Sequence, residues 1–138
     1  MPDYRFNISL RLRHPSWEPE SATNILGLTP NRIWRAGESR TSPKGAPLEG
    51  VYKNSYWTAQ VAKGRSQQTR LATAIGDVIE SLSPSQQFFI DFSGSGGIAE
   101  FLIGWFFDEG NSGDVLDWRL LERLSQMRIG LSFDVYGR

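Results

Sequence analysis

The sequence predicts an α+β protein, a single-domain two-layer sandwich in which helices lie on one face of a mostly antiparallel sheet. The first indication is the apolar run 98–107, where one alternating set of side chains is wholly apolar and the other nearly so, as in a strand deep inside a sheet. The second is the order of periodic segments, β-α-β-β-α-β-β-α-β. The third is a length of 138 residues without an interdomain linker, which favours one domain over residues 1–138.

The N-terminal segment predicts one strand followed by one short helix. Residues 4–12 alternate, with apolar side chains facing one way and Arg, Asn and Ser facing the other. The helix is expected to have Pro19 at its first position and to stop at Gly27, with Trp17 packing onto Ala22.

The next region predicts two strands joined by a long loop. Residues 32–36 and 52–62 have the composition and alternation of strands, and we expect them to pair as a long-looped hairpin. The segment between them, residues 37–50, is rich in Pro, Gly and basic residues, so we expect a mobile basic loop without regular structure.

The middle of the chain predicts a helix and then a tight hairpin. Apolar residues recur at helical spacing over 69–82, and the Ser-Pro pair that follows is expected to stop this helix. Residues 88–93 predict a strand, and residues 94–97 a turn into the central strand 98–107. The large side chains expected in the core of that strand are Phe101 and Trp105.

The C-terminal region predicts a polar loop over 108–114, a helix and a last strand over 131–136. Asp117 is the expected N-cap of the helix, and Leu116 is placed to pack against Leu121. The side chains expected to be buried are Leu120, Leu121, Leu124 and Met127 from the helix and Leu131, Phe133 and Val135 from the strand.

Composition excludes several kinds of site. The chain has no Cys, which excludes disulfides, thiolate metal sites and cysteine nucleophiles, and its single His excludes a multi-histidine metal site. The N-terminus lacks an apolar signal core, and the apolar run 98–107 is too short to span a membrane. We therefore expect a cytoplasmic protein with no membrane contact.

Charge is neutral in total but uneven along the chain. Residues 1–70 carry 11 Lys or Arg against 5 Asp or Glu, whereas residues 71–138 carry 4 against 10. Such halves could form a bipolar surface that steers a charged partner. The preferred interpretation is that both halves share one sheet and that their charges intermix.

Two motifs resemble ligand sites, and both are interpreted as turns. Residues 94–99 fit the dinucleotide-binding fingerprint, but that fingerprint needs a helix after its glycines and a strand is predicted here. Residues 108–114 carry oxygen ligands, but Gly110 and Ser112 stand where an EF-hand requires carboxylates. No cofactor and no metal are therefore expected.

A small enzyme or small-ligand-binding protein with a cleft near His14 is one alternative function. His14 could act as a general base, although its position before Pro15 at a strand end favours a structural role, and no nucleophile pairs with it by spacing. The carboxylates that could orient it are Asp91, Glu100 and Asp134. The candidate cleft or open-face residues are Arg13, His14, Arg35 and Tyr56.

Binding of single-stranded nucleic acid on the open face of the sheet ranks third. Arginines that could neutralise phosphates occur beside aromatic residues that could stack on bases. These residues are Arg11, Arg13, Arg35, Arg40, Trp34, Tyr56 and Trp57. The neutral total charge disfavours this function, and core tryptophans flanked by solvated arginines are the preferred interpretation.

Several short motifs occur in an order and spacing that point to one family. They are Arg13-His14-Pro15, Trp34-Arg35-Ala36-Gly37, Tyr56-Trp57, Gly104-Trp105-Phe106, Asn111-Ser112-Gly113 and Leu131-Ser132-Phe133-Asp134-Val135-Tyr136. With them the chain resembles, nearly end to end, the bacterial family called domain of unknown function 4279. The resemblance implies a similar size and α+β layout and supplies no catalytic residues. The chain departs from it at Asp117-Trp118, where relatives tend to show Ser or Thr followed by Pro.

The expected function is that of a protein-binding module, and an immunity protein that neutralises a cognate toxin is one recurrent kind. Four acidic residues around one loop could meet a basic, toxin-like surface. These candidate partner-binding residues are Asp108, Glu109, Asp114 and Asp117.

Overall fold

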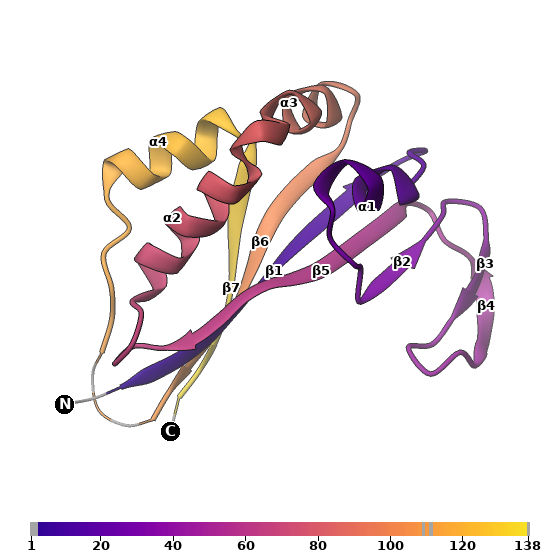
Figure 1. The fold of residues 1–138 in the computed structure, drawn as a ribbon. Helices are drawn as coiled ribbons and strands as arrows, with labels where there is room; N and C mark the ends of the chain where they lie inside the picture. The colour runs from indigo at the N-terminus through magenta and orange to yellow at the C-terminus, as the bar shows by residue number, and fades with distance from the viewer. Residues whose placement is uncertain (1–2, 109, 111, 138) are drawn as a thin grey trace.

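The computed structural model describes residues 3–108, 110 and 112–137, and it contains a five-stranded sheet, a two-stranded sheet and helices that pack on one face of the larger sheet (Figure 1). The α+β sandwich predicted from the sequence is therefore confirmed. In chain order the elements are β1 (Tyr4–His14), α1 (Glu20–Leu26), β2 (Arg32–Trp34), β3 (Ser39–Thr41), β4 (Pro47–Val51), β5 (Ser55–Arg65), α2 (Leu71–Leu82), η1 (Ser83–Ser85), α3 (Gln86–Gly94), β6 (Ile98–Phe107), α4 (Trp118–Gln126) and β7 (Ile129–Tyr136).

Strand β1 lies at the centre of the larger sheet, whose strand order is β2-β5-β1-β6-β7. It pairs antiparallel with β5 along one edge and with β6 along the other. Strand β2 pairs with β5, as predicted, and the β6–β7 pair is parallel. The apolar strand β6 therefore lies between two neighbours as predicted, but the central position belongs to β1.

The two faces of this sheet differ in what covers them. Buried side chains alternate with more exposed ones along β1, so one face contacts the helices and the other is open. Trp57 of β5, Phe101 of β6 and Ile75 of α2 are fully buried on the helix side. Trp105 lies on the same side and is half-buried. No described helix covers the opposite face.

Residues 88–93 belong to helix α3, so the strand predicted for them is wrong. Buried Phe89 and Phe92 are three residues apart, which places them on one side of a helix. The Ser-Pro pair at 83–84 begins the short turn η1, because proline fits the first turn of a helix, and the chain continues into α3. Residues 95–97 therefore join α3 to β6, and the predicted hairpin is also wrong.

Residues 37–50 are not an irregular loop, because β3 and β4 pair antiparallel. The turn between them has backbone hydrogen bonds from Gly45 N to Ser42 O and from Ser42 N to Ala46 O, both 2.8 Å. Gly45 has φ 88°, which glycine adopts without steric strain. Every residue of β3 and β4 is exposed, so no apolar alternation marked these strands in the sequence. The hairpin projects beyond the sheet edge at β2 (Figure 1).

Helix α1 ends as predicted and begins one position later than expected. Pro19 is the N-cap residue of α1, and Gly27 ends the helix with φ 66°. Trp17 packs edge-on against Phe92 of α3, with ring centroids 4.8 Å apart, so the segment before α1 contacts α3.

Helix α4 begins at the predicted cap. The carboxylate of Asp117 accepts a hydrogen bond from Leu120 N at 3.0 Å. Burial follows the prediction except at Leu121, which is 48% exposed. The residues of this region that are buried as predicted are Leu120, Leu124 and Met127.

Strand β7 is less buried than predicted. Leu131 is half-buried, whereas Phe133 and Val135 project to the helix side as predicted but remain 39% and 60% exposed. The physical reason is the position of β7 at the sheet edge, where a strand has a neighbour on one side only.

Candidate ligand-binding face

The open face of the sheet is built in rows from residues that lie opposite one another in neighbouring strands. Directly paired residues project to the same side of a sheet, so each row shares one surface. The first row consists of Trp34, Tyr56 and Arg13. The second consists of Arg32, Thr58, Arg11 and Glu100. The structure thus brings together Arg13 and Tyr56, two of the residues predicted for this face.

Three aromatic rings stack at the β2 end of this face. The ring of Trp34 lies 4.4 Å from the ring of Tyr52 and 4.4 Å from the ring of Tyr56, with interplanar angles of 11° and 21°. The guanidinium carbon of Arg32 lies 4.9 Å from the centroid of Trp34. Each of the three aromatic residues is half-buried.

These rings form one side of a cavity of about 380 Å³, which we call the aromatic cleft. Its volume lies in the range of small-ligand pockets. The charged residues that line it are three cations, Arg13, Arg40 and Lys53, and none of the described lining residues is acidic. An anion bearing an aromatic ring matches this lining, because the cations attract its charge and the rings can stack on its own.

Hydrogen bonds to Thr41 of β3 fix the position of the Tyr52 ring in the cleft. The hydroxyl of Tyr52 donates to Thr41 O and accepts from Thr41 N, both at 3.0 Å. Arg32 also donates to Thr41 O, at 2.8 Å. Hydrogen bonding by Thr41, assisted by Arg32, lowers the pKa of Tyr52 from its ordinary value. The hairpin that seemed irregular in sequence is therefore part of the site.

An ion pair lies next to the cleft in the second row. Arg11 Nε donates to Glu100 Oε1 at 2.8 Å, and Arg13 lies 3.4 Å from the same oxygen. One carboxylate thus faces two guanidinium groups, which leaves net positive charge at this point of the face.

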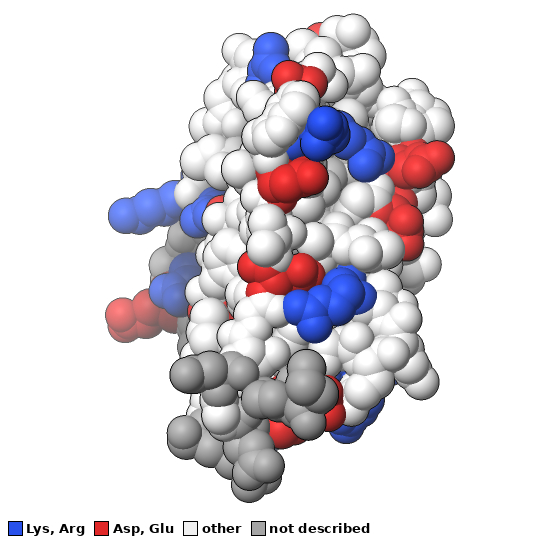
Figure 2. Space-filling model, turned by 90° about the vertical axis from the view of Figure 1, so that its left-hand side faces the viewer, with Lys and Arg blue, Asp and Glu red and all other residues white. Residues whose placement is uncertain are grey.

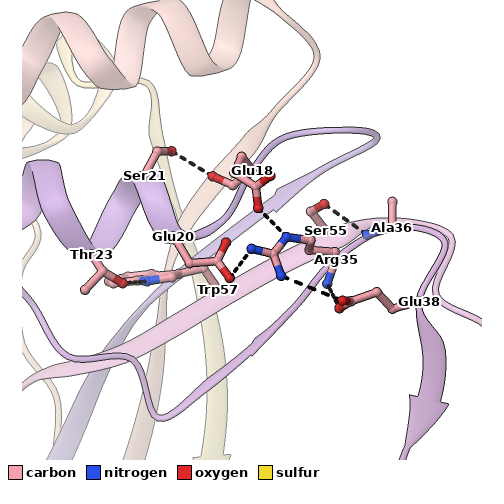
Figure 3. Close-up of polar contacts among 9 residues, drawn as sticks. All are labelled: Glu18, Glu20, Ser21, Thr23, Arg35, Ala36, Glu38, Ser55 and Trp57. Atoms are coloured by element: carbon pink, nitrogen blue, oxygen red, sulfur yellow. Dashed lines mark hydrogen bonds and ion pairs between the residues drawn. The ribbon is translucent and has the colours of Figure 1, made fainter.

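Arg35 does not lie on the open face, although it was a candidate for it. Its guanidinium forms ion pairs with three carboxylates, those of Glu18, Glu20 and Glu38 (Figure 3). The hydrogen bond from Arg35, followed by one from Glu20, lowers the pKa of Glu18. Arg35 therefore joins the start of α1 to the segment after β2, and its charge is compensated.

Trp57 also lies away from the open face. It is fully buried in the core, where its indole N–H donates to Thr23 Oγ1 at 3.0 Å (Figure 3). The alternation of β5 explains the difference, since Tyr56 and Trp57 are adjacent and project to opposite sides of the sheet.

His14 is buried, and both of its ring nitrogens form hydrogen bonds. Ser16 N donates to His14 Nδ1 at 3.0 Å, so in the neutral ring the proton is on Nε2, which lies 2.9 Å from Ser95 Oγ. Ser95 in turn donates to Phe92 O at 3.1 Å. His14 is therefore a donor to Ser95 and is not placed to remove its proton. Within the described part of the chain, none of the hydrogen bonds of this imidazole involves a carboxylate.

A second cavity, of about 470 Å³, lies between α1 and α3. It is lined mainly by apolar residues, and Asp91 is its one charged lining residue among those described. The orienting role considered for Asp91 has no support here, because its carboxylate accepts a hydrogen bond from Gln87 at 2.8 Å. His14 is not part of the lining.

The acidic residues of the 108–117 region do not form one exposed cluster. Asp114 Oδ2 accepts from Ala72 N at 2.8 Å and from the hydroxyl of Tyr4 at 3.3 Å, which places it at the start of α2. Asp117 caps α4, and Asp108 is exposed with its N–H bonded to Asp3 O. Glu109 lies outside the described residues. Two of the candidate partner-binding carboxylates are thus used to start helices.

Charge is distributed differently on the two sides of the molecule. On the side seen in Figure 2, Lys and Arg alternate with Asp and Glu. Along the open face of β1, by contrast, three of the five side chains are arginines, at positions 5, 11 and 13. The charges therefore intermix only in part, and the open face keeps an excess of cations.

Among the described residues, no cluster of three or more His, Asp or Glu is arranged to hold a metal ion. The same residues include no helix with the length and apolar character needed to cross a bilayer.

Some residues of the face were missed in the sequence. Arg32 could have been found, because it alternates with Trp34 across Ile33 in a predicted strand. Tyr52 and Lys53 lie just before β5 and reach the cleft only because the β3–β4 hairpin folds toward them. No local pattern marks that approach.

Comparison with known proteins identifies one family. The profile of the family described as Domain of unknown function (DUF4279) matches residues 4–138, a range that includes every strand and helix from β1 to β7. Neither the comparison with curated proteins nor that with solved structures gave a match. The chain belongs to the DUF4279 family, as its motifs indicated.

Proposed function

We propose that this protein binds single-stranded nucleic acid on the open face of its sheet, in the cytoplasm, with the aromatic cleft as the principal contact. The observation that carries the proposal is the stack of Tyr52, Trp34 and Tyr56 beside three cations without a described acidic lining residue. Stacking on an aromatic ring contributes about 1–3 kcal/mol per base and tolerates any sequence.

The geometry favours single strands over duplexes. Bases in a single strand are free to unstack and lie on aromatic rings, whereas the bases of a duplex are paired and stacked on one another. The open face is formed by strands, and its rings lie along the surface. The neutral total charge is compatible with this function, because many of the acidic residues occupy other parts of the molecule.

A protein partner is the second candidate, and one observation favours it. Large apolar side chains are exposed around α4 and the edge strand β7, with Trp118 at 63% and Val135 at 60%. An immunity protein could use such an edge to hold its toxin. The acidic loop offers less support, because Asp114 accepts a hydrogen bond from Ala72 N in the first turn of α2 and Asp117 caps α4. Co-purification with the product of a neighbouring gene, abolished by Trp118→Ser but not by Tyr56→Ala, would favour this candidate.

The test of nucleic-acid binding is the fluorescence anisotropy of labelled dT12 and rU12 titrated with the protein. Tyr56→Ala removes a stacking surface, so we expect affinity to fall about 5- to 150-fold at 1.4 kcal/mol per tenfold. Tyr56→Phe keeps the ring and should bind like the parent. Arg119→Gln, which removes an exposed cation from α4, is the matched control and should also leave affinity unchanged.

Two outcomes would overturn the proposal. One is the absence of saturable binding to either oligonucleotide at low salt. The other is displacement of labelled dT12 by inorganic polyphosphate as effectively as by unlabelled dT12, because polyphosphate has charge but no bases to stack. Urea midpoints of all variants establish that each protein is folded.

A further inference from the structure

A second group of aromatic and basic side chains lies at the other end of the open face. The guanidinium carbon of Arg5 lies 4.3 Å from the centroid of Phe106, and Phe106 stacks on Tyr136 at 4.8 Å with planes 8° apart. These three residues form one row across β1, β6 and β7. The construction repeats that of the aromatic cleft, where Arg32 lies over Trp34 within a stack.

A β-bulge brings two further cations to this end. Ile8 pairs with Ala62 and Ser9 with Gln60, which leaves Val61 of β5 without a partner in the register. The extra residue reverses the alternation of β5, so Lys63 and Arg65 lie opposite Asn7 and Arg5 and project to the open face. Without the bulge, both cations would project toward the helix side.

These cations line a cavity of about 380 Å³. Its charged lining residues are Arg5, Lys63 and Arg65, and none of its described lining residues is acidic. We call this cavity together with Phe106 and Tyr136 the distal platform. The distal platform and the aromatic cleft therefore offer the same two features, stacked aromatic rings and a group of three cations, at opposite ends of one face.

The two sites are a fixed distance apart, because both include residues of β1. Arg13 contributes to the cleft and Arg5 to the distal platform, and eight residues of strand at about 3.3 Å each separate them by about 26 Å. Arg5 lies near the N-terminal end of β1 and Arg13 near its C-terminal end, and Figure 1 shows the strand that runs between them. The open-face side chains between them along β1 are Asn7, Ser9 and Arg11.

We propose that the distal platform is a second subsite for the same strand, so that one single-stranded nucleic acid spans the face from the aromatic cleft to the distal platform. This inference rests on the proposed function. At the stacked spacing of about 3.4 Å per nucleotide, 26 Å corresponds to about eight nucleotides.

The test is the dependence of affinity on strand length, measured with dT2, dT4, dT8 and dT12. A strand that reaches both subsites gains from the high effective concentration of its second contact. Affinity should therefore rise at least tenfold between dT4 and dT8, and change little between dT8 and dT12. A longer oligonucleotide also offers more overlapping positions to a single site. A rise in affinity that is only proportional to this number of positions would overturn the proposal.

The double variant Lys63→Gln, Arg65→Gln isolates the distal platform. Both side chains are exposed, so the variant is expected to fold. It should bind dT12 about as weakly as the parent binds dT4, while its affinity for dT2 stays unchanged. For dT12, the slope of log affinity against log salt should become shallower by about 1.4, because each lost phosphate contact on a single strand contributes about 0.7. An equal loss with dT2 and dT12 would contradict the second subsite.

The control variant is Arg119→Gln with Arg128→Gln, which removes two exposed cations of the C-terminal region outside the face. It should match the parent at every length. Failure of all four oligonucleotides to bind would refute the proposed function itself, whereas binding without a length step would refute the second subsite alone.

Discussion

The indole of Trp34 stacks on the phenol ring of Tyr56, with centroids 4.4 Å apart and planes inclined by 21°. The two residues occupy directly opposite positions of β2 and β5 on the uncovered face of the sheet. The neighbouring residue of β5, Trp57, is fully buried on the other face. The alternation of β5 thus places these two adjacent aromatic residues on opposite faces of the sheet. Trp57 lies in the core, and Tyr56 lines the aromatic cleft.

The core under α2 is expected to be sensitive to loss of side-chain volume. Ile75 is fully buried on the helix face that meets the sheet, so Ile75→Ala should lower the free energy of unfolding by about 2–5 kcal/mol. Urea denaturation gives this value from the shift in midpoint. Thr73→Ala, at an exposed position of the same helix, is the control and should change stability by less than about 0.5 kcal/mol. Equal midpoints for both variants would show that this face is not packed.

Gly94 at the end of α3 and Gly97 just after it are expected to respond differently to replacement by alanine. A Cβ added at Gly97 would lie 2.5 Å from ring carbons of Phe92 and 2.7 Å from its carbonyl oxygen. Gly97→Ala should therefore destabilise the protein by about 1–3 kcal/mol or more. Gly94→Ala meets nothing within 4 Å and should be neutral or slightly stabilising. Thermal denaturation of the two variants tests this difference. A larger loss of stability in Gly94→Ala than in Gly97→Ala would contradict the packing described for Phe92.

Asp114 is expected to stabilise the start of α2. Asp114→Ala leaves Ala72 N and the hydroxyl of Tyr4 without this acceptor, so unfolding free energy should fall by about 1–3 kcal/mol. Asp108→Ala, at an exposed position of the same loop, should have little effect. If the loop were only a repulsive acidic surface for a partner, removal of either charge would leave stability level or raise it. Urea midpoints of the two variants distinguish these cases.

Arg35 should hold the carboxyl of Glu18 ionised to lower pH than usual. Its hydrogen bond is the main reason that the pKa of Glu18 is lowered, with Glu20 second. A lowered folded-state pKa means that this stabilisation is present above the ordinary carboxyl pKa of about 4.3 and is lost as pH falls through the lowered value. In Arg35→Gln the pKa should return toward its ordinary value. Carboxyl-carbon NMR titration measures this, and Arg40→Gln, which should leave Glu18 unaffected, is the control.

Long periodic segments explain which parts of the fold were predictable. Strands β1 and β6 and helix α2 have unambiguous alternation or helical spacing, and the cap of α4 was marked by Asp117. Helix α3 was missed because its short aromatic run also fits a strand. The β3–β4 hairpin was missed because its side chains are exposed and carry no periodic apolar signal.

The candidate site was only partly predictable, for a related reason. Arg13 and Tyr56 were found because they belong to regular strands with a clear alternation. Arg35 was misplaced, because two acidic residues at or just before the start of α1 and one just after β2 meet it in the fold. Lys63 and Arg65 were missed because the bulge at Val61 changes the alternation of β5, and no residue in the sequence marks that extra position.

The most direct test of the account is the salt dependence of dT12 binding. Cations of the cleft and the distal platform should each release counterions when they meet a phosphate, so six such contacts at about 0.7 each predict a slope of log affinity against log salt near about −4. These cations are Arg5, Arg13, Arg40, Lys53, Lys63 and Arg65. Changing Arg13, Arg40 and Lys53 together to Gln should reduce the slope to about −2. A slope near zero for the parent, or an unchanged slope in the triple variant, would contradict nucleic-acid binding by this face.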